Sequence, residues 1–174
     1  MCTTDDPADD LCRHREIAAD DSIEFKVLPT WRPDRALSVE KKDFVEYMAQ
    51  LSRASGKKIR HFEDWKEALM ERMDYFARMG CLASDHSLLY VPWQPAKEKE
   101  IANIFNARMQ GNTVSQEEEL KFKTAAMHWL AKEYERRGWV MQLHFGVTRN
   151  NNTAMYQRLG ADTGFDGIYN RVPI

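Results

Sequence analysis

The chain has 174 residues and a mass of 20.4 kDa, carries 30% charged residues with a formal net charge of -2, and has a pI near 6.2. This length suits one domain that can bury a core. The balanced charge gives no basic field for nucleic acid or for an anionic membrane, so small molecules or proteins are the expected partners. No apolar run approaches the roughly 20 residues of a membrane span, and no signal peptide is recognisable.

The cysteines give a prediction about the cellular compartment. Cys2, Cys12 and Cys81 are odd in number and show no C-x-x-C spacing. This pattern argues against a disulfide framework and a zinc knuckle and fits a reducing compartment. We therefore expect a cytoplasmic protein.

The first part of the chain predicts a helix followed by a strand. Asp6 followed by Pro7 is typical of an N-cap and a first helical turn, which predicts a helix from Pro7 to about Ala19. The next stretch, IEFKVLPTW (residues 23–31), is rich in branched and aromatic residues and predicts a short strand.

Two amphipathic helices and a second strand come next. Apolar residues repeat at helical spacing over residues 38–56 and again over 61–80, and each stretch ends in a glycine suited to a helix C-terminus. The stretch CLASDHSLLYV (residues 81–91) then predicts a strand that contains Asp85 and His86.

Two further helices are predicted, from Lys97 to Met109 and from Ser115 to Arg137, within a helical insertion at about residues 95–137. The stretch WVMQLHFGV (residues 139–147) predicts another strand, and a short helix and the turn GADTGFDG follow it. This alternation of strands and helices predicts an α/β fold with a parallel sheet.

In such a fold, polar groups at the carboxyl ends of the strands meet the ligand. The sequence offers four such places: Thr3–Asp6, Trp31–Arg32, Asp85–His86 and His144–Arg149.

Arg32 has two readings. A strand-end arginine can hold a carboxylate with two parallel N–H bonds, or it can form a structural ion pair with an acid early in the following helix. Asp5 and Asp6 also have two possible roles, helix capping and catalysis, and we favour helix capping.

The histidines have several possible roles. His86 and Asp85 suggest a base and the residue that orients it, although neighbours on a regular strand point to opposite faces. His144 could bind a metal, move a proton or be a hydrogen-bonded core residue. The other histidines are expected to be surface residues: His14, His61 and His128.

Five motifs together resemble a known family. In order along the chain, they are TTDDP, VLPTWRPDRA, GCLASDHSL, FKTAAMHWLAKEYERRGWVMQLHFGVTRNNN and LGADTGFDGI. They resemble uronate isomerase, the glucuronate/galacturonate isomerase of the amidohydrolase superfamily, over nearly the whole chain.

The resemblance implies a (β/α)8 TIM barrel of which this chain would form about strands two to five. It implies the conversion of D-glucuronate to D-fructuronate, or of D-galacturonate to D-tagaturonate, through an enediol-like species that needs a base, an acid and oxyanion stabilisation. It also implies that Arg32 lies at the substrate carboxylate. The resemblance and the strand-end pattern together predict catalytic His144, Asp85 and His86, and substrate-binding Arg32, Trp31, Thr4, Asp5 and Arg149.

The departures from the family indicate an internal piece. Family members are longer and bind a divalent metal, usually zinc, with a first-strand H-x-H pair and a last-strand aspartate. This chain has no H-x-H and ends at NRVPI, so we expect it to bind no metal alone. Four strands cannot close an eight-stranded barrel, so the open edges could allow self-association.

Three hypotheses follow. The chain is part of an active uronate isomerase; or it is a non-catalytic truncated or split-gene product that needs a complementary chain; or, less favoured, it belongs to a metal-dependent hydrolase of the same superfamily. The TWRPD and RNNN stretches fit uronates and argue against the third.

Overall fold

The computed structural model describes residues 1–161 and 163–168, so Asp162 in the predicted last turn and the NRVPI end lie outside the described residues. The chain forms two compact units. The first contains residues 1–86 and 92–142, and the second contains residues 87–91 and the chain from 143 onward.

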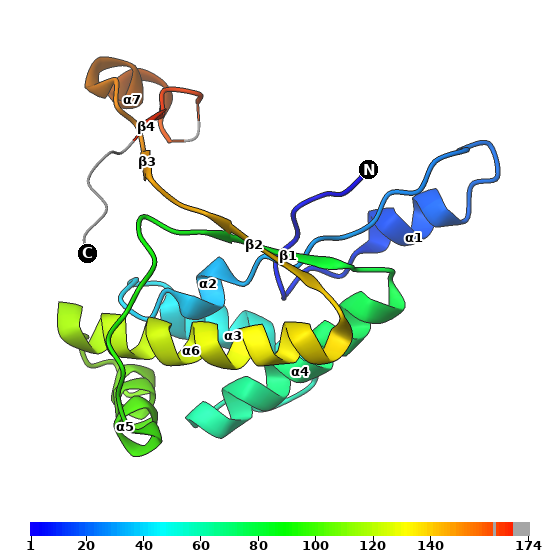
Figure 1. Cartoon of the computed structure of the whole chain (residues 1–174). Coiled ribbons are helices and arrows are strands. Elements are labelled where there is room, and N and C mark those ends of the chain that lie inside the picture. The colour runs from blue at the N-terminus through cyan, green and yellow to red at the C-terminus, as the bar shows by residue number, and fades with distance from the viewer. Residues whose placement is uncertain (162, 169–174) are drawn as a thin grey trace. The chain divides into compact units, whose positions relative to one another are not determined.

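The order of elements confirms an α/β protein (Figure 1). The helices are α1 (Cys12–Ala18), α2 (Asp34–Leu37), α3 (Phe44–Ser55), α4 (Phe62–Arg78), α5 (Glu98–Met109), α6 (Gln116–Arg137) and α7 (Thr153–Leu159). The strands are β1 (Ala83–Ser87), β2 (Val140–His144), β3 (Val147–Thr148) and β4 (Gly167–Ile168). The antiparallel β3–β4 pair in the second unit was not predicted.

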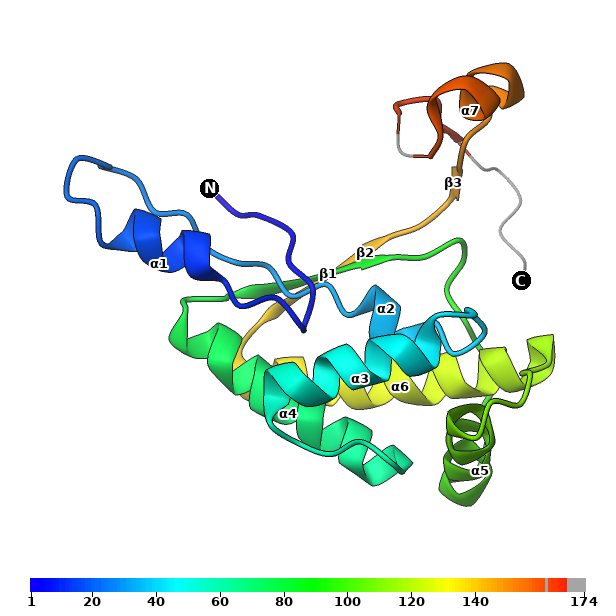
Figure 2. The ribbon, with the colours of Figure 1, turned by 180° about the vertical axis from the view of Figure 1, so that it is seen from behind.

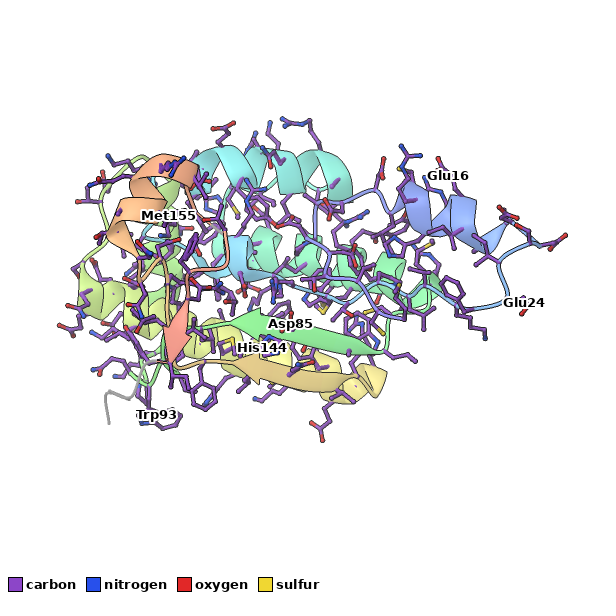
Figure 3. All side chains as sticks on the ribbon, turned by 90° about the horizontal axis from the view of Figure 1, so that it is seen from above. Glu16, Glu24, Asp85, Trp93, His144 and Met155 are labelled. Atoms are coloured by element: carbon purple, nitrogen blue, oxygen red, sulfur yellow. The ribbon has the colours of Figure 1, made fainter. Side chains whose placement is uncertain are left out.

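Extended segments lie side by side in the first unit. β1 and β2 form a two-stranded sheet, and their arrows point the same way (Figure 3). Trp31 forms parallel bridges to Ser84 of β1 and to Asp5, and Cys2 bridges Leu28 in the same sense. The strand predicted over residues 23–31 is therefore reduced to isolated bridges, because Pro29, between the two paired residues, has no N–H to donate to a ladder.

Aromatic side chains fill the core between the strands and the helices. Helices α3, α4 and α6 lie on the same side of β1 and β2 in both views of the ribbon (Figures 1 and 2). Trp31 is completely buried and meets Phe76 of α4 edge-on, with ring centroids 5.0 Å apart. A second cluster joins α3 to α6 and consists of Phe44, Phe62, Trp65, Phe105 and Phe122. Burial of such large side chains dominates the stability of a core.

The first helix begins later than predicted. α1 starts at Cys12 rather than at Pro7, because the carbonyls of Pro7 and Asp9 accept hydrogen bonds from the buried Arg72 guanidinium at 2.7 and 2.6 Å. In a helix those carbonyls would accept from amides four residues further along. Asp6 accordingly closes a turn, with its Oδ1 accepting from the Ala8 amide at 2.9 Å, and caps no helix.

The other helix ends follow the sequence closely. Ser115 and Glu118 form the predicted capping box at the start of α6. Gly138 then ends this helix with φ +65°, a left-handed conformation that favours glycine. Within the described residues, no helix is both long and apolar enough to cross a bilayer.

Candidate active site

Backbone pairing brings three of the predicted strand ends together. The Arg32 amide donates to the carbonyl of Asp5 at 2.9 Å, and the Asp85 amide donates to the carbonyl of Trp31 at 2.8 Å. The residues around Asp5, Arg32 and Asp85 therefore form one edge, as the parallel arrangement predicts.

The Arg32 side chain lies between two carboxylates. Its Nη2 donates to Oδ2 of Asp85, and its Nε lies 3.8 Å from Oδ2 of Asp34 in α2. Asp85 is buried, whereas about a third of the Arg32 side chain is exposed. Arg32 can therefore both form a structural ion pair and bind a ligand carboxylate, because its guanidinium contacts a buried acid and is still partly exposed to solvent.

The exposed part of Arg32 faces a pocket of about 460 Å³. The pocket is lined by Thr4, Asp5, Asp6, Asp9, Arg32, Asp34 and Arg35. Of the predicted substrate-binding residues, Thr4, Asp5 and Arg32 thus share one pocket, and the sequence analysis missed Arg35. The two guanidinium groups of this lining can bind a carboxylate, and its four aspartate carboxylates can accept hydrogen bonds from hydroxyls.

Asp6 is fixed at the border of this pocket. The Tyr47 hydroxyl donates to its Oδ1 at 2.8 Å, and the Arg35 guanidinium stacks over the Tyr47 ring at 4.3 Å. Burial raises the pKa of Asp6, because a desolvated carboxylate is disfavoured.

His86 is neutral and completely buried. Burial lowers its pKa to about 4, an effect that the nearby Asp85 opposes and Arg32 reinforces. Its Nε2 lies 3.0 Å from the Tyr134 hydroxyl of α6, and its Nδ1 lies 4.0 Å from Oδ1 of Asp34. The two neighbours His86 and Asp85 therefore face different partners, in line with the alternation expected along a strand.

Trp31, His144 and Arg149 do not line this pocket. The Trp31 ring packs into the core. His144 and Arg149 belong to the second unit. His144 is exposed at the end of β2 (Figure 3). Arg149 binds Asp166 Oδ2 through Nη1 at 2.8 Å and the Ser87 hydroxyl through Nη2 at 2.9 Å.

A divalent metal, as implied by the family resemblance, would stabilise developing oxyanion charge. Among residues 1–161 and 163–168, no group of three or more His, Cys, Asp or Glu side chains could hold one. The described residues therefore do not fit a metal, and we assign no step to one.

Asp34 is the acid early in the following helix that the sequence offered as a partner of Arg32, and it lies 3.8 Å from Nε. Other site residues gave little sequence signal. Tyr134 occupies a core position of α6 and its role depends on a contact 48 residues away in sequence. The prediction that His14 lies on the surface was wrong, because only 8% of it is exposed and Thr3 contacts its ring.

Together, the fold and the site define an α/β protein that gathers an arginine–aspartate pair and a neutral histidine at the carboxyl ends of parallel segments. The sequence model of the glucuronate isomerase family matches residues 1–174. The chain therefore belongs to the glucuronate isomerase family.

Relatives of known sequence and structure agree with this assignment. The chain is 52% identical over 168 residues to a uronate isomerase of Lachnoclostridium phytofermentans and 48% identical to one of Lachnospira eligens. Each match covers 97% of this chain but only 36% of the relative. Two solved structures resemble it over its full length. They are a uronate isomerase from Thermotoga maritima (TM-score 0.90, 32% identity, 38% of that chain) and a glucuronate isomerase from Caulobacter crescentus (TM-score 0.86, 25% identity, 36% of that chain).

Proposed function

We propose that the chain forms the hexuronate-binding part of a uronate isomerase, which converts D-glucuronate to D-fructuronate or D-galacturonate to D-tagaturonate in hexuronate catabolism. The observation that carries this proposal is the Arg32 guanidinium, braced by Asp85 on one side and facing the pocket on the other. Arg32 would hold the permanent carboxylate of the substrate in a bidentate manner. Thr4 and Asp5 would bind its hydroxyls.

The isomerisation moves a proton between neighbouring carbons, and His86, Asp85 and His144 are the proposed catalytic groups. His86 is neutral but a weak base, because burial lowers its pKa to about 4. Asp34, which lines the pocket 4.0 Å from its Nδ1, would connect it to the substrate. Trp31 would act by positioning Arg32, since its ring is buried and its backbone pairs with Ala83 and Asp85. Arg149 stays a proposed substrate-binding residue.

We further propose that residues 1–174 correspond to about strands two to five of a (β/α)8 TIM barrel with a helical insertion at about 95–137. The parallel bridges and the high TM-score against longer isomerases support this assignment. Exposure alternates along β2, and Val140, Gln142 and His144 are the exposed residues. Within the described residues, the sheet that contains β2 consists of β1 and β2. The other edge of β2 could pair with another chain, which is the proposed route to self-association. We expect a cytoplasmic protein without nucleic-acid or membrane partners.

A second proposal is that the chain alone binds the sugar but does not turn it over. The relatives support this alternative, because the chain spans 36% of the length of each of the two isomerases compared above. Catalysis would then need a complementary chain or the remaining length of the enzyme.

An assay of the chain at high concentration separates the two proposals. D-glucuronate is incubated with the chain, with and without added zinc or manganese, and D-fructuronate is followed by NMR. Turnover supports catalysis by the chain itself. Binding of D-glucuronate by a folded sample without turnover supports the second proposal. If a folded sample shows no binding and no turnover, the site assignment is wrong.

A further inference from the structure

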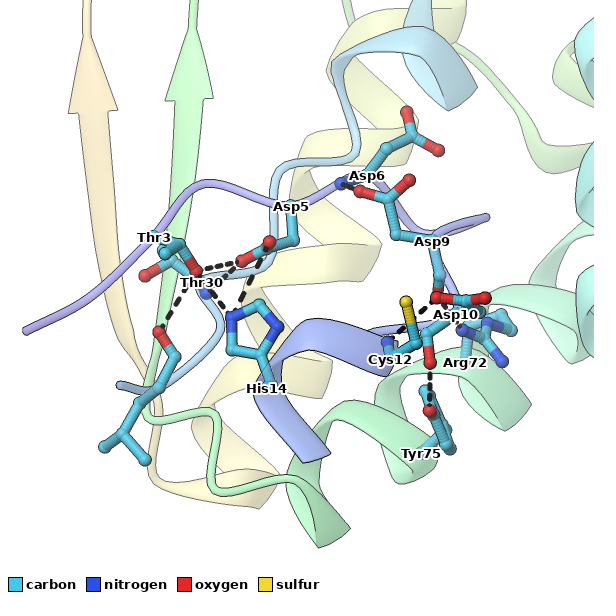
Figure 4. Close-up of polar contacts among 11 residues, drawn as sticks. Thr3, Asp5, Asp6, Asp9, Asp10, Cys12, His14, Thr30, Arg72 and Tyr75 are labelled. Carbon is cyan, nitrogen blue, oxygen red and sulfur yellow. Dashed lines mark hydrogen bonds and ion pairs between the residues drawn. The ribbon is translucent and has the colours of Figure 1, made fainter. Parts of the chain in front are cut away.

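His14 forms a part-buried hydrogen-bonded chain with Thr3 and Asp5 (Figure 4). The Thr3 hydroxyl lies 2.6 Å from Oδ2 of Asp5 and 2.8 Å from Nε2 of His14. Asp5 lines the pocket together with Arg32. These hydrogen bonds therefore connect a histidine that the sequence analysis placed on the surface to a proposed substrate-binding residue.

Two of the three contacts of the Thr3 hydroxyl, the Asp5 carboxylate and the Leu28 carbonyl at 3.3 Å, are acceptors, which indicates the direction of each hydrogen bond. A hydroxyl has one proton, and the Thr3 hydroxyl donates it to the Asp5 carboxylate, its shortest contact and a charged acceptor. The same oxygen must then accept from His14. His14 Nε2 consequently carries a proton, and its Nδ1 has no hydrogen-bond partner among the described residues.

The Asp5 carboxylate is held at one oxygen and left available at the other. Oδ2 accepts from the Thr3 hydroxyl and also from the Thr30 amide at 3.1 Å. Oδ1 lies 3.8 Å from Nε2 of His14, beyond hydrogen-bond distance. The side chain is 12% exposed, so its orientation depends on these few partners.

We propose that Thr3 and His14 are positioning residues, which hold the Asp5 carboxylate so that Oδ1 accepts a hydroxyl of the hexuronate bound by Arg32. This proposal rests on the proposed function, because it names the group that Asp5 would bind. A carboxylate locked in one orientation loses less conformational freedom when the sugar binds.

The first test uses NMR of the isotope-labelled chain and needs no ligand. At mildly alkaline pH, long-range ¹H–¹⁵N spectra should show His14 as a single Nε2–H tautomer, and three-bond couplings should show a single χ1 rotamer for Asp5. Thr3→Val, which removes only the hydroxyl, should average both signals, while Thr3→Ser should preserve them. An Nδ1–H tautomer of His14, or an unchanged Asp5 rotamer in Thr3→Val, would overturn the positioning role.

The second test measures affinity for D-glucuronate by titration calorimetry. Thr3→Val and His14→Leu should weaken binding about tenfold, as expected for a lost hydrogen bond in a charged network. Thr3→Ser and His14→Gln, which keep a hydroxyl and an N–H near the Nε2 position, should stay within about threefold of the parent. Equal affinities for all four variants would overturn the proposal.

The two failures are distinguishable. If the parent chain binds no D-glucuronate, then the proposed function fails and the sugar-binding role of Asp5 fails with it. If the parent binds and the variants behave alike, only the positioning role fails.

Discussion

The Arg32 guanidinium and the Asp85 carboxylate form an ion pair between adjacent extended segments, with Asp85 almost fully buried. The backbone enforces this pairing, because the Asp85 amide donates to the carbonyl of Trp31. A buried carboxylate without its partner is costly. The pair therefore links the stability of the strand ends to the residue proposed to bind the substrate.

Arg32→Met should lower the free energy of unfolding by about 2 kcal/mol, because it leaves Asp85 buried without its guanidinium. The double variant Arg32→Met/Asp85→Asn should be more stable than the single variant, since the uncompensated charge is gone. Urea unfolding of the parent, both single variants and the double variant measures the coupling. Strictly additive effects of the two substitutions would contradict the ion pair.

The stability of the chain should fall in acid through His86. Its pKa is about 4 in the folded protein, compared with an ordinary value of 6.5 that applies to the unfolded chain. Between pH 4 and pH 6.5, the unfolded chain therefore binds a proton that the native state does not. The unfolding free energy should thus decrease as pH falls through this window, by about 3 kcal/mol in total.

In that window, the unfolding free energy of His86→Gln should depend less steeply on pH than that of the parent. The difference in slope should correspond to about one bound proton. Urea unfolding at a series of pH values measures this difference. His128→Gln serves as a control, because His128 is exposed on α6. The same slope in the parent and in His86→Gln would mean that His86 titrates normally.

Tyr134→Phe should destabilise the chain by about 1–2 kcal/mol, because it removes the hydroxyl that contacts His86 Nε2 in a fully buried place. Tyr156→Phe on α7 is the matched control, since Tyr156 is 47% exposed, and should change stability by less than about 0.5 kcal/mol. Thermal unfolding of both variants measures the effect, and equal melting temperatures would exclude a stabilising role of this contact.

Arg72→Met should loosen the turn at residues 6–11, because the guanidinium donates to carbonyls of Pro7, Asp9 and Ala54. We expect a loss of about 3 kcal/mol and faster amide exchange in that turn. Arg78→Met, on an exposed position of the same helix, is the control. Unchanged exchange in the turn of Arg72→Met would show that the turn is stable by itself.

Local signals in the sequence predicted the elements that depend on neighbouring residues. Helices α3 and α4 show clear apolar periodicity, and α6 begins at a capping box and ends at Gly138. All of these signals are decided within a few residues. The predicted strand ends also converged, because parallel pairing places Asp5, Arg32 and Asp85 at one edge.

The errors arose from contacts between distant residues. The start of α1 depends on Arg72, which lies 65 residues from Pro7 in sequence. The burial of His14 depends on how α1 is placed against Thr3, and Tyr134 meets His86 only after α6 has packed on β1. No periodicity within a single segment contains this information.

The most direct test of the proposed function is the selectivity of the chain for a sugar that carries a carboxylate. Titration calorimetry compares D-glucuronate with D-glucose, which lacks the carboxylate, for the parent and for Arg32→Met. We predict that the parent binds D-glucuronate at least about 30-fold more tightly than D-glucose, or by about 2 kcal/mol, and that Arg32→Met loses this preference. Equal affinity of the parent for the two sugars, or a preference that persists in Arg32→Met, would contradict the assignment of Arg32 to the substrate carboxylate.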